Sequence, residues 1–303
     1  MPMPFSRRDF LRTLALAAAA SNIDVDALLA ATPGEADRER LAAWLRRLRD
    51  DGLASPRSPL GPAVARVGEM ALGSPYKANT LEEYLAEPGA SPWREPVTAY
   101  LTGFDCVSLV ESALAIARLA AREDAGWEAF EREIVRMRYR EGVREGYPSR
   151  LHYFSEWIAD NARRGLVRDL GPELGALDDA RPLRFMSTHR SAYRALADDA
   201  VYDAIRGMER RLDASPRQLI PTSRIPSVLD RLETGDVLAF ATSIGGLDVT
   251  HTGLAYRDRA GVMRVLHAPL SGGVVQVSRG TLPQYVAGLR NATGILAARP
   301  LRG

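Results

Sequence analysis

Apolar residues recur with helical spacing in the first half of the chain. Leu41, Leu45 and Leu48 are four and three residues apart and give one apolar face to a helix over residues 36–50. Similar stripes predict three further helices, over residues 107–122, 128–139 and 152–164. Glycine and proline gather between these helices and predict loops at residues 51–62, 73–79 and 141–150.

The pattern changes to that of strands after Gly235. Residues 170–230 mix helical stretches with scattered prolines and predict no clear element. The segments that follow with strand character are residues 236–241, 250–256, 262–268 and 274–277. Helices first and consecutive antiparallel strands later predict an α+β fold.

A predicted hairpin brings two histidines together. Its turn, residues 258–261, is centred near Arg259 and Ala260. His251 lies eight residues before Arg259, and His267 lies eight residues after it. The two imidazoles should therefore lie nearly opposite each other on one face of the sheet, with Cβ atoms roughly 5 Å apart. A register error of one residue would place them on opposite faces. Gly253 leaves room beside them.

Cys106 is the only cysteine of the chain. A lone cysteine excludes an intramolecular disulfide framework and any zinc site built from several thiolates. Asp105 precedes the predicted helix as an N-cap should, which makes Cys106 its first residue. The helix dipole and the free amides there favour a thiolate. The alternative is a small buried hydrophobic residue.

A thiol at a helix start and two histidines on one sheet face point to nucleophilic catalysis. One imidazole would take the thiol proton, and the second imidazole would orient the first. The Cys106 amide could help to stabilise an oxyanion. A packed histidine pair is one alternative. Zinc is another, because Cys106, His251, His267 and His152 could supply ligands. No His-Glu-x-x-His or paired-cysteine spacing supports zinc, so we expect no metal and no cofactor.

Composition restricts the partners. The chain has 303 residues, of which 46% are apolar, enough for a sizeable core. A formal net charge of +2 is too small to argue for nucleic acid. No apolar run reaches the length of a bilayer-spanning helix, so we expect no stable membrane insertion.

The first residues resemble a twin-arginine export signal. Arg7 and Arg8 precede Phe10 and Leu11, and a short apolar segment follows over residues 13–20. An ordinary amphipathic helix is the alternative, and small residues leave two positions open for cleavage. We expect residues 1–31 to form an export signal and linker, and the protein to reach the periplasm or cell envelope.

Residues 104–111, FDCVSLVE, resemble the nucleophile motif of the DUF1460 family, which is related to the NlpC/P60 cysteine peptidases. Ser108 stands where that family more often has threonine. Further segments match in family order: residues 74–76, 80–82, 138–140, 149–154, 246–253, 266–268 and 291–295. The linked set covers most of the chain from Ser74 onward.

The resemblance implies a papain-like NlpC/P60-type fold, with the cysteine-bearing helix packed on an antiparallel sheet. It implies a single cysteine hydrolase domain over residues 32–303, with a helical N-terminal part and a β-rich C-terminal part. Cys106 becomes the nucleophile, His251 the base and His267 its orienter. The substrate-site candidates are Tyr76, Asp105, Arg150, His152, Tyr153 and Asp248.

The implied activity is that of an N-acetylmuramoyl-L-alanine amidase acting on peptidoglycan fragments (muropeptides). A γ-D-glutamyl endopeptidase on stem peptides is the alternative within the same chemistry. A non-catalytic wall-binding protein is disfavoured, because binding alone needs neither a thiol nor two histidines. Some candidates have simpler roles open to them. Asp105 could only cap its helix, Tyr153 could be core, Arg150 could be an exposed loop residue, and His152 could be structural.

We predict that export depends on the arginine pair. Replacing Arg7 and Arg8 together by lysine should retain the protein in the cytoplasm, because the twin-arginine machinery reads the pair itself rather than its charge. Cell fractionation with an antibody to the protein measures this. Unchanged export of the double variant would contradict the signal assignment.

Overall fold

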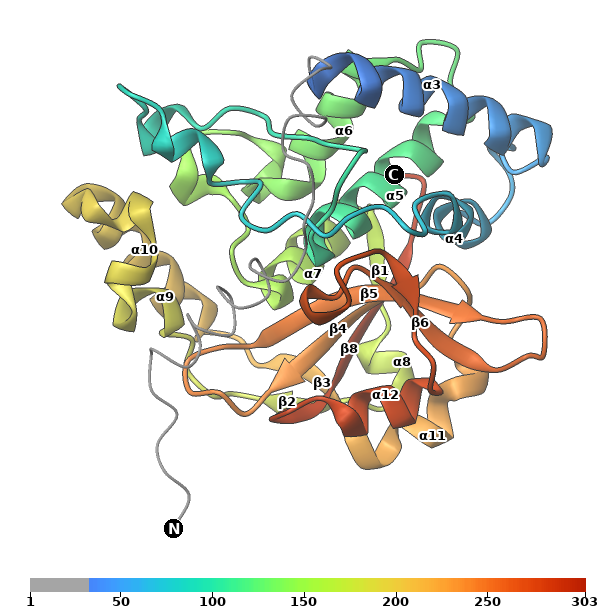
Figure 1. Cartoon of the computed structure of the whole chain (residues 1–303). Coiled ribbons are helices and arrows are strands. Elements are labelled where there is room, and N and C mark those ends of the chain that lie inside the picture. The colour runs from blue at the N-terminus through green and yellow to red at the C-terminus, as the bar shows by residue number, and fades with distance from the viewer. Residues whose placement is uncertain (1–32) are drawn as a thin grey trace.

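The structure is a computed structural model that describes residues 33–303. The proposed export signal, residues 1–31, lies outside the described residues, so the boundary at residue 32 stays a prediction. A central antiparallel sheet carries a layer of long helices on one face and shorter helices on the other (Figure 1).

The predicted helices are present, with ends that differ by up to three residues. The helical layer above the sheet contains α3 (Pro33–Asp50), α4 (Gly61–Met70), α5 (Cys106–Leu119), α6 (Trp127–Arg138) and α7 (Phe154–Arg163). The sequence did not predict α4. It packs closely on the sheet, because a Cβ at Gly68 would lie only 2.8 Å from a methyl group of Leu266.

The expected α+β class is confirmed. The strands are β1 (Val167–Asp169), β2 (Leu177–Asp179), β3 (Arg217–Pro221), β4 (Val237–Thr242), β5 (Val249–Arg257), β6 (Met263–His267), β7 (Gln276–Val277) and β8 (Ala292–Pro300). Their order is β2-β3-β8-β4-β5-β6-β7, and β1 also pairs with β8. The four predicted strands correspond to β4 to β7. Hydrophobic alternation did not predict β8, although it pairs with both β3 and β4.

The segment that gave no clear prediction contains three short helices and one long one, α10. They are α8 (Gly171–Leu174), α9 (Phe185–Thr188), α10 (Asp199–Leu212) and α11 (Ile225–Val228), and α12 (Leu282–Gly288) follows later in the chain. In Figure 1, α11 and α12 lie below the sheet, and α9 and α10 lie at one end of the molecule. Single 3₁₀ turns occupy Glu83–Ala86, Pro92–Arg94, Arg140–Gly142, Tyr147–Ser149, Arg190–Ala192, Arg194–Ala197, Thr222–Arg224, Leu229–Arg231 and Leu270–Gly272.

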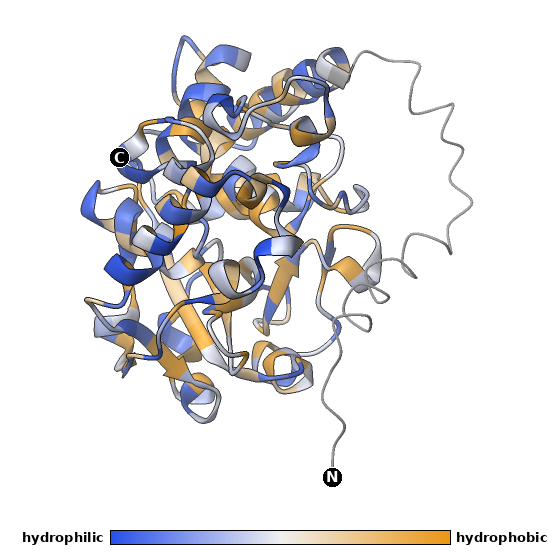
Figure 2. Cartoon of the chain, turned by 90° about the vertical axis from the view of Figure 1, so that its left-hand side faces the viewer, coloured by the Kyte–Doolittle hydropathy of each residue, from blue (hydrophilic) through white to orange (hydrophobic). Residues whose placement is uncertain are grey.

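Apolar side chains from both faces of the sheet form separate cores. Val110 and Leu114 of α5 pack with Leu254 above the sheet. Phe240 and Leu282 belong to the core below it. The central strands are accordingly hydrophobic, whereas the peripheral helices carry hydrophilic positions (Figure 2). Among the described residues, no helix is long and apolar enough to cross a bilayer.

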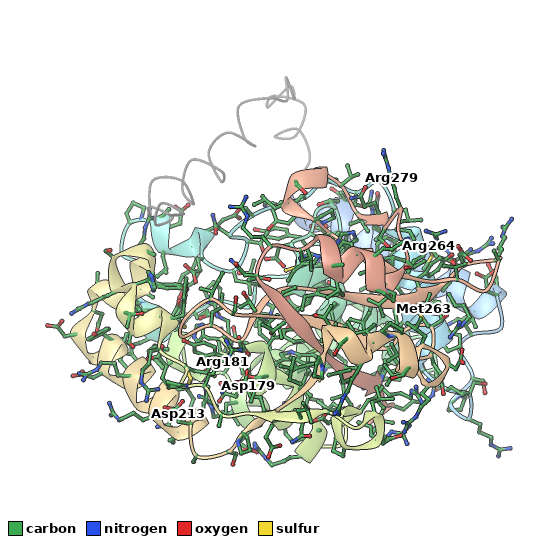
Figure 3. All side chains as sticks on the ribbon, turned by 90° about the horizontal axis from the view of Figure 1, so that it is seen from below. Asp179, Arg181, Asp213, Met263, Arg264 and Arg279 are labelled. Atoms are coloured by element: carbon green, nitrogen blue, oxygen red, sulfur yellow. The ribbon has the colours of Figure 1, made fainter. Side chains whose placement is uncertain are left out.

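The sheet ends in short or charged edge strands. Asp179 on β2 forms an ion pair with Arg181 at 2.7 Å. Figure 3 shows both residues on the side of the molecule where Asp213 lies. The strand at the other end of the order, β7, has two residues. Both features limit edge-to-edge pairing with other chains.

The hairpin differs from the prediction in register. The pairing of β5 with β6 is centred on Ala260, one residue later than Arg259. His267 therefore lies opposite Gly253, where an added Cβ would be 3.0 Å from the Cβ of His267. His251 and His267 are diagonal rather than direct neighbours. Moving the centre by one residue shifts the partner by two, so the histidines keep the same face.

Candidate active site

The first turn of α5 presents Cys106. Asp105 is the N-cap, and its Oδ1 accepts a hydrogen bond from the Ser108 amide at 2.7 Å. The Asp105 amide donates in return to Ser108 Oγ at 2.9 Å, which completes a capping box. The predicted cap is confirmed, and Cys106 is the first helical residue and half-buried.

A side-chain hydrogen bond ties this helix start to the sheet. Thr252 Oγ1 donates to the carbonyl oxygen of Cys106 at 2.9 Å. Thr252 directly follows His251 on β5. The thiol-bearing residue and the strand that carries the first histidine are therefore held together by one short contact.

The two histidines are hydrogen-bonded. Nε2 of His251 lies 2.8 Å from Nδ1 of His267, and the rings meet at an interplanar angle of 75°. Phe240 stacks on His251 with 5.7 Å between centroids. Nε2 of His251 is thus engaged by His267, and Nδ1 is the ring nitrogen of His251 that takes no part in this contact.

Two tyrosines lie near the thiol, and one of them contacts the histidine pair. The hydroxyl of Tyr285 on α12 lies 3.2 Å from Nδ1 of His267. The charge of ionised Cys106 contributes, after burial, to raising the pKa of Tyr285 and also that of Tyr76. Such an effect requires proximity. Cys106, Tyr76, Tyr285 and the histidines therefore share one neighbourhood.

Burial keeps the catalytic candidates neutral. It raises the pKa of the Cys106 thiol to about 11, and the charge of Asp105 acts in the same direction. Burial, followed by the charge of His267, lowers the pKa of His251 to about 3. Burial also lowers the pKa of His267 to about 4. Desolvation thus opposes the thiolate that a helix start favours, and the thiolate itself stays a prediction.

Tyr76 and Asp105 are the substrate candidates that lie beside the thiol. Asp105 is adjacent in sequence and half-buried. Tyr76 forms a parallel bridge with Phe104, and its amide donates to the Gly273 carbonyl oxygen at 2.7 Å. Both residues border the helix start, and substrate contact by either of them stays a prediction.

Arg150 and His152 lie in a buried polar cluster. Arg150 Nη2 donates to Glu82 Oε1 at 3.0 Å, and its Nε is 3.7 Å from a Glu95 oxygen. At 5% exposure Arg150 is no exposed loop residue. Nε2 of His152 is 2.8 Å from the Tyr147 carbonyl oxygen. Burial, and then the charge of Arg150, hold the pKa of His152 well below its usual value.

Tyr153 and Asp248 make contacts that stabilise the fold. The Tyr153 hydroxyl donates to Glu209 Oε1 at 2.7 Å and joins α7 to α10. Asp248 Oδ2 accepts from the Ser155 amide at 2.8 Å, in the first turn of α7. Substrate contact by these residues, and by Arg150 and His152, stays a prediction.

The sequence did not point to three residues of the site. Thr252 had a weak signal, since it adjoins His251. Phe240 read only as part of an apolar run. Tyr285 had no signal, because α12 lies outside the hairpin and reaches His267 only in the folded chain. Within residues 33–303, no group of three or more histidine, cysteine or acidic side chains is arranged to hold a metal ion.

Comparison with known proteins defines the class. The family model described as N-acetylmuramoyl-L-alanine amidase-like (AmiA-like) matches residues 66–295, so the chain belongs to this family. The predicted family resemblance is confirmed. No match to a curated protein was found.

Solved structures agree on the fold. An N-acetylmuramoyl-L-alanine amidase from Bacteroides uniformis aligns with a TM-score of 0.72 and 28% identity, over 80% of this chain and 99% of that one. A Bacteroides fragilis protein provisionally described as a xylanase aligns with a TM-score of 0.70 and 32% identity. The alignment covers 77% of this chain and 99% of that one. A DUF1460 protein from Legionella pneumophila aligns with a TM-score of 0.65 over 89% of this chain and 96% of that one. At 19% identity this likeness shows the fold alone.

The raised pKa of Cys106 predicts how fast the thiol is alkylated. Only the thiolate reacts, so the iodoacetamide rate in the folded protein should rise about tenfold per pH unit from pH 7 to 10. It should level off only near pH 11. The protein unfolded in urea is the control and should level off near pH 9. A plateau of the folded protein below pH 8 would instead reveal a thiolate–imidazolium pair.

The raised pKa of Cys106 also makes the stability of the fold depend on pH. The folded pKa is the higher one, so between about pH 9 and 11 the unfolded chain loses the proton and the folded chain keeps it. The free energy of unfolding should therefore fall as the pH rises through this window.

Proposed function

We propose that this protein is a cysteine-dependent hydrolase of peptidoglycan fragments that cleaves the amide bond between N-acetylmuramic acid and L-alanine. The observation that carries the proposal is the chain of contacts from Cys106 through Thr252 to the strand of His251, together with the His251–His267 hydrogen bond. Membership of an amidase-like family supports the choice of bond. We also propose that the fold is of the papain-like NlpC/P60 type.

The resting state requires proton transfer during the reaction. Neutral His251 would take the thiol proton at Nδ1 while sulfur attacks the carbonyl carbon of the lactyl group. The Cys106 amide, at the first position of the helix, would donate to the oxyanion. The imidazolium of His251 would then protonate the leaving L-alanine nitrogen. Water, deprotonated by His251, would hydrolyse the thioester and restore the thiol.

A γ-D-glutamyl endopeptidase is the second candidate, because a specific residue favours it. Asp105 places a carboxylate beside Cys106, where it could hold the free amine of L-alanine. Arg150, which could have anchored peptide carboxylates for an amidase, is already paired with Glu82 and Glu95. Analysis of the reaction products must therefore decide which bond is cleaved.

The cellular setting follows from the same proposal. Peptidoglycan lies outside the cytoplasmic membrane, so an enzyme that acts on it there must be exported. We propose the periplasm or cell envelope as the location and the twin-arginine machinery as the partner in transit. No metal or cofactor takes part in the proposed steps.

We predict unequal roles for the two histidines. His251→Ala should lose nearly all activity, because it removes the imidazole that the proposed mechanism assigns to take the thiol proton. His267→Asn should keep a measurable fraction, since an amide oxygen can still accept the hydrogen bond from His251 Nε2. Initial rates of both variants, with circular dichroism as a folding control, test this. The reverse order would mean that the roles are exchanged.

We predict the products of a defined substrate. A disaccharide tetrapeptide should yield the intact disaccharide and a free tetrapeptide beginning with L-alanine, as detected by mass spectrometry. A sugar that still bears a dipeptide would show cleavage after D-glutamate and identify the endopeptidase. Cys106→Ala should give neither product while folding normally. Activity in that variant, or loss of wild-type activity with EDTA, would contradict the thiol mechanism.

A further inference from the structure

We infer that Tyr285 is a positioning residue whose hydroxyl donates to Nδ1 of His267 and thereby selects the tautomer in which His251 can accept a proton. The inference rests on the proposed catalytic roles of the two histidines. It assigns a task to a residue on α12, far from both histidines in sequence, and it concerns proton placement rather than substrate contact.

The geometry brings two groups to a single nitrogen. Nδ1 of His267 is 2.8 Å from His251 Nε2 and 3.2 Å from the Tyr285 hydroxyl oxygen. The Tyr285 ring also meets the His267 ring edge-on, with 4.9 Å between centroids and 76° between planes. Phe240 packs against both His251 and Tyr285. The four rings form one continuous cluster.

Helix α12 holds Tyr285 in place. Thr281 and Gln284 form a capping box at its start. Leu282 and Val286, four residues apart on one face, are fully buried in the lower core. Tyr285 lies between them in sequence and is half-buried. Its hydroxyl is therefore presented by a packed helix rather than by a loose loop, which favours a defined hydrogen bond.

A neutral imidazole carries one proton on one of its two nitrogens. If Nδ1 of His267 carries it, that nitrogen donates to His251 Nε2. Neutral His251 must then hold its own proton at Nδ1, where it cannot take another. If Nδ1 of His267 is bare, it accepts from His251 Nε2–H, and Nδ1 of His251 is free to act as base. The second arrangement is the productive one.

The Tyr285 hydroxyl favours the productive arrangement because it has a proton to donate. Burial raises the pKa of Tyr285, so the phenol stays protonated across the working range of pH. A donor aimed at Nδ1 of His267 stabilises the bare nitrogen. Phenylalanine at this position would keep the ring contacts and remove only this preference.

The test compares Tyr285→Phe with the wild type by two measurements. Nitrogen chemical shifts of ¹⁵N-histidine-labelled protein report which ring nitrogen carries the proton. The wild type should show His267 with Nδ1 bare, and the variant should show the ratio of the two tautomers shifted by about fivefold toward the Nδ1-protonated form, as loss of one neutral hydrogen bond implies. On muropeptides, kcat should fall by the same factor as the fraction of protein in the productive tautomer, while KM changes less than twofold.

Tyr256→Phe is the matched control. Its hydroxyl donates to Glu69 Oε1 at 2.8 Å, away from the histidines, and its loss should leave both the tautomers and kcat unchanged. Unaltered histidine shifts in folded Tyr285→Phe would overturn the inference, even with reduced kcat. A rise in KM at constant kcat would also overturn it, because it would show a substrate contact. An inactive wild type would instead defeat the proposed function, and the tautomer measurement would still decide the inference.

Discussion

The hydrogen bond from Thr252 to the Cys106 carbonyl oxygen joins the two halves of the site. Cys106 belongs to a helix in the upper layer, whereas His251 belongs to the sheet beneath it. Their side chains can cooperate only if the start of α5 is fixed against β5 to within a fraction of an ångström. The capping box at Asp105 fixes the first turn, and the bond from Thr252 fixes its height above the strand.

The chain that leads into Cys106 has little regular structure and depends on buried polar side chains. Its backbone groups need partners that a sheet ladder would otherwise supply. Asp37 of α3 accepts from the Leu101 and Thr102 amides, at 2.7 and 2.9 Å. Arg138 donates to the Thr98 carbonyl oxygen at 2.5 Å, and Arg150 holds Glu82 and Glu95 of the same segment. Buried charges are costly unless paired, so this segment has one well-defined path to the site.

Burial gives the site its chemical character. In a wet cleft the thiol and imidazole would sit near their usual pKa values, and the helix dipole could tip the pair toward ions. Here desolvation separates the two pKa values and leaves both groups neutral. In the proposed mechanism, proton transfer is thereby coupled to substrate attack, and the orientation of each proton matters. A hydrogen-bonded chain that ends at Tyr285 becomes significant for that reason.

The sequence by itself determined the α+β class, the N-cap at Asp105, the place of Cys106 at a helix start, and the shared face of His251 and His267. These follow from local rules of periodicity, capping and strand alternation, which act over a few residues. Tertiary structure decided the rest. Turn geometry made the histidines diagonal, and packing turned Arg150 and Tyr153 inward. Strand β8 and Tyr285 could not be predicted because their partners are distant in sequence. The raised pKa of the Cys106 thiol could not be predicted because desolvation exists only once the chain has folded around it.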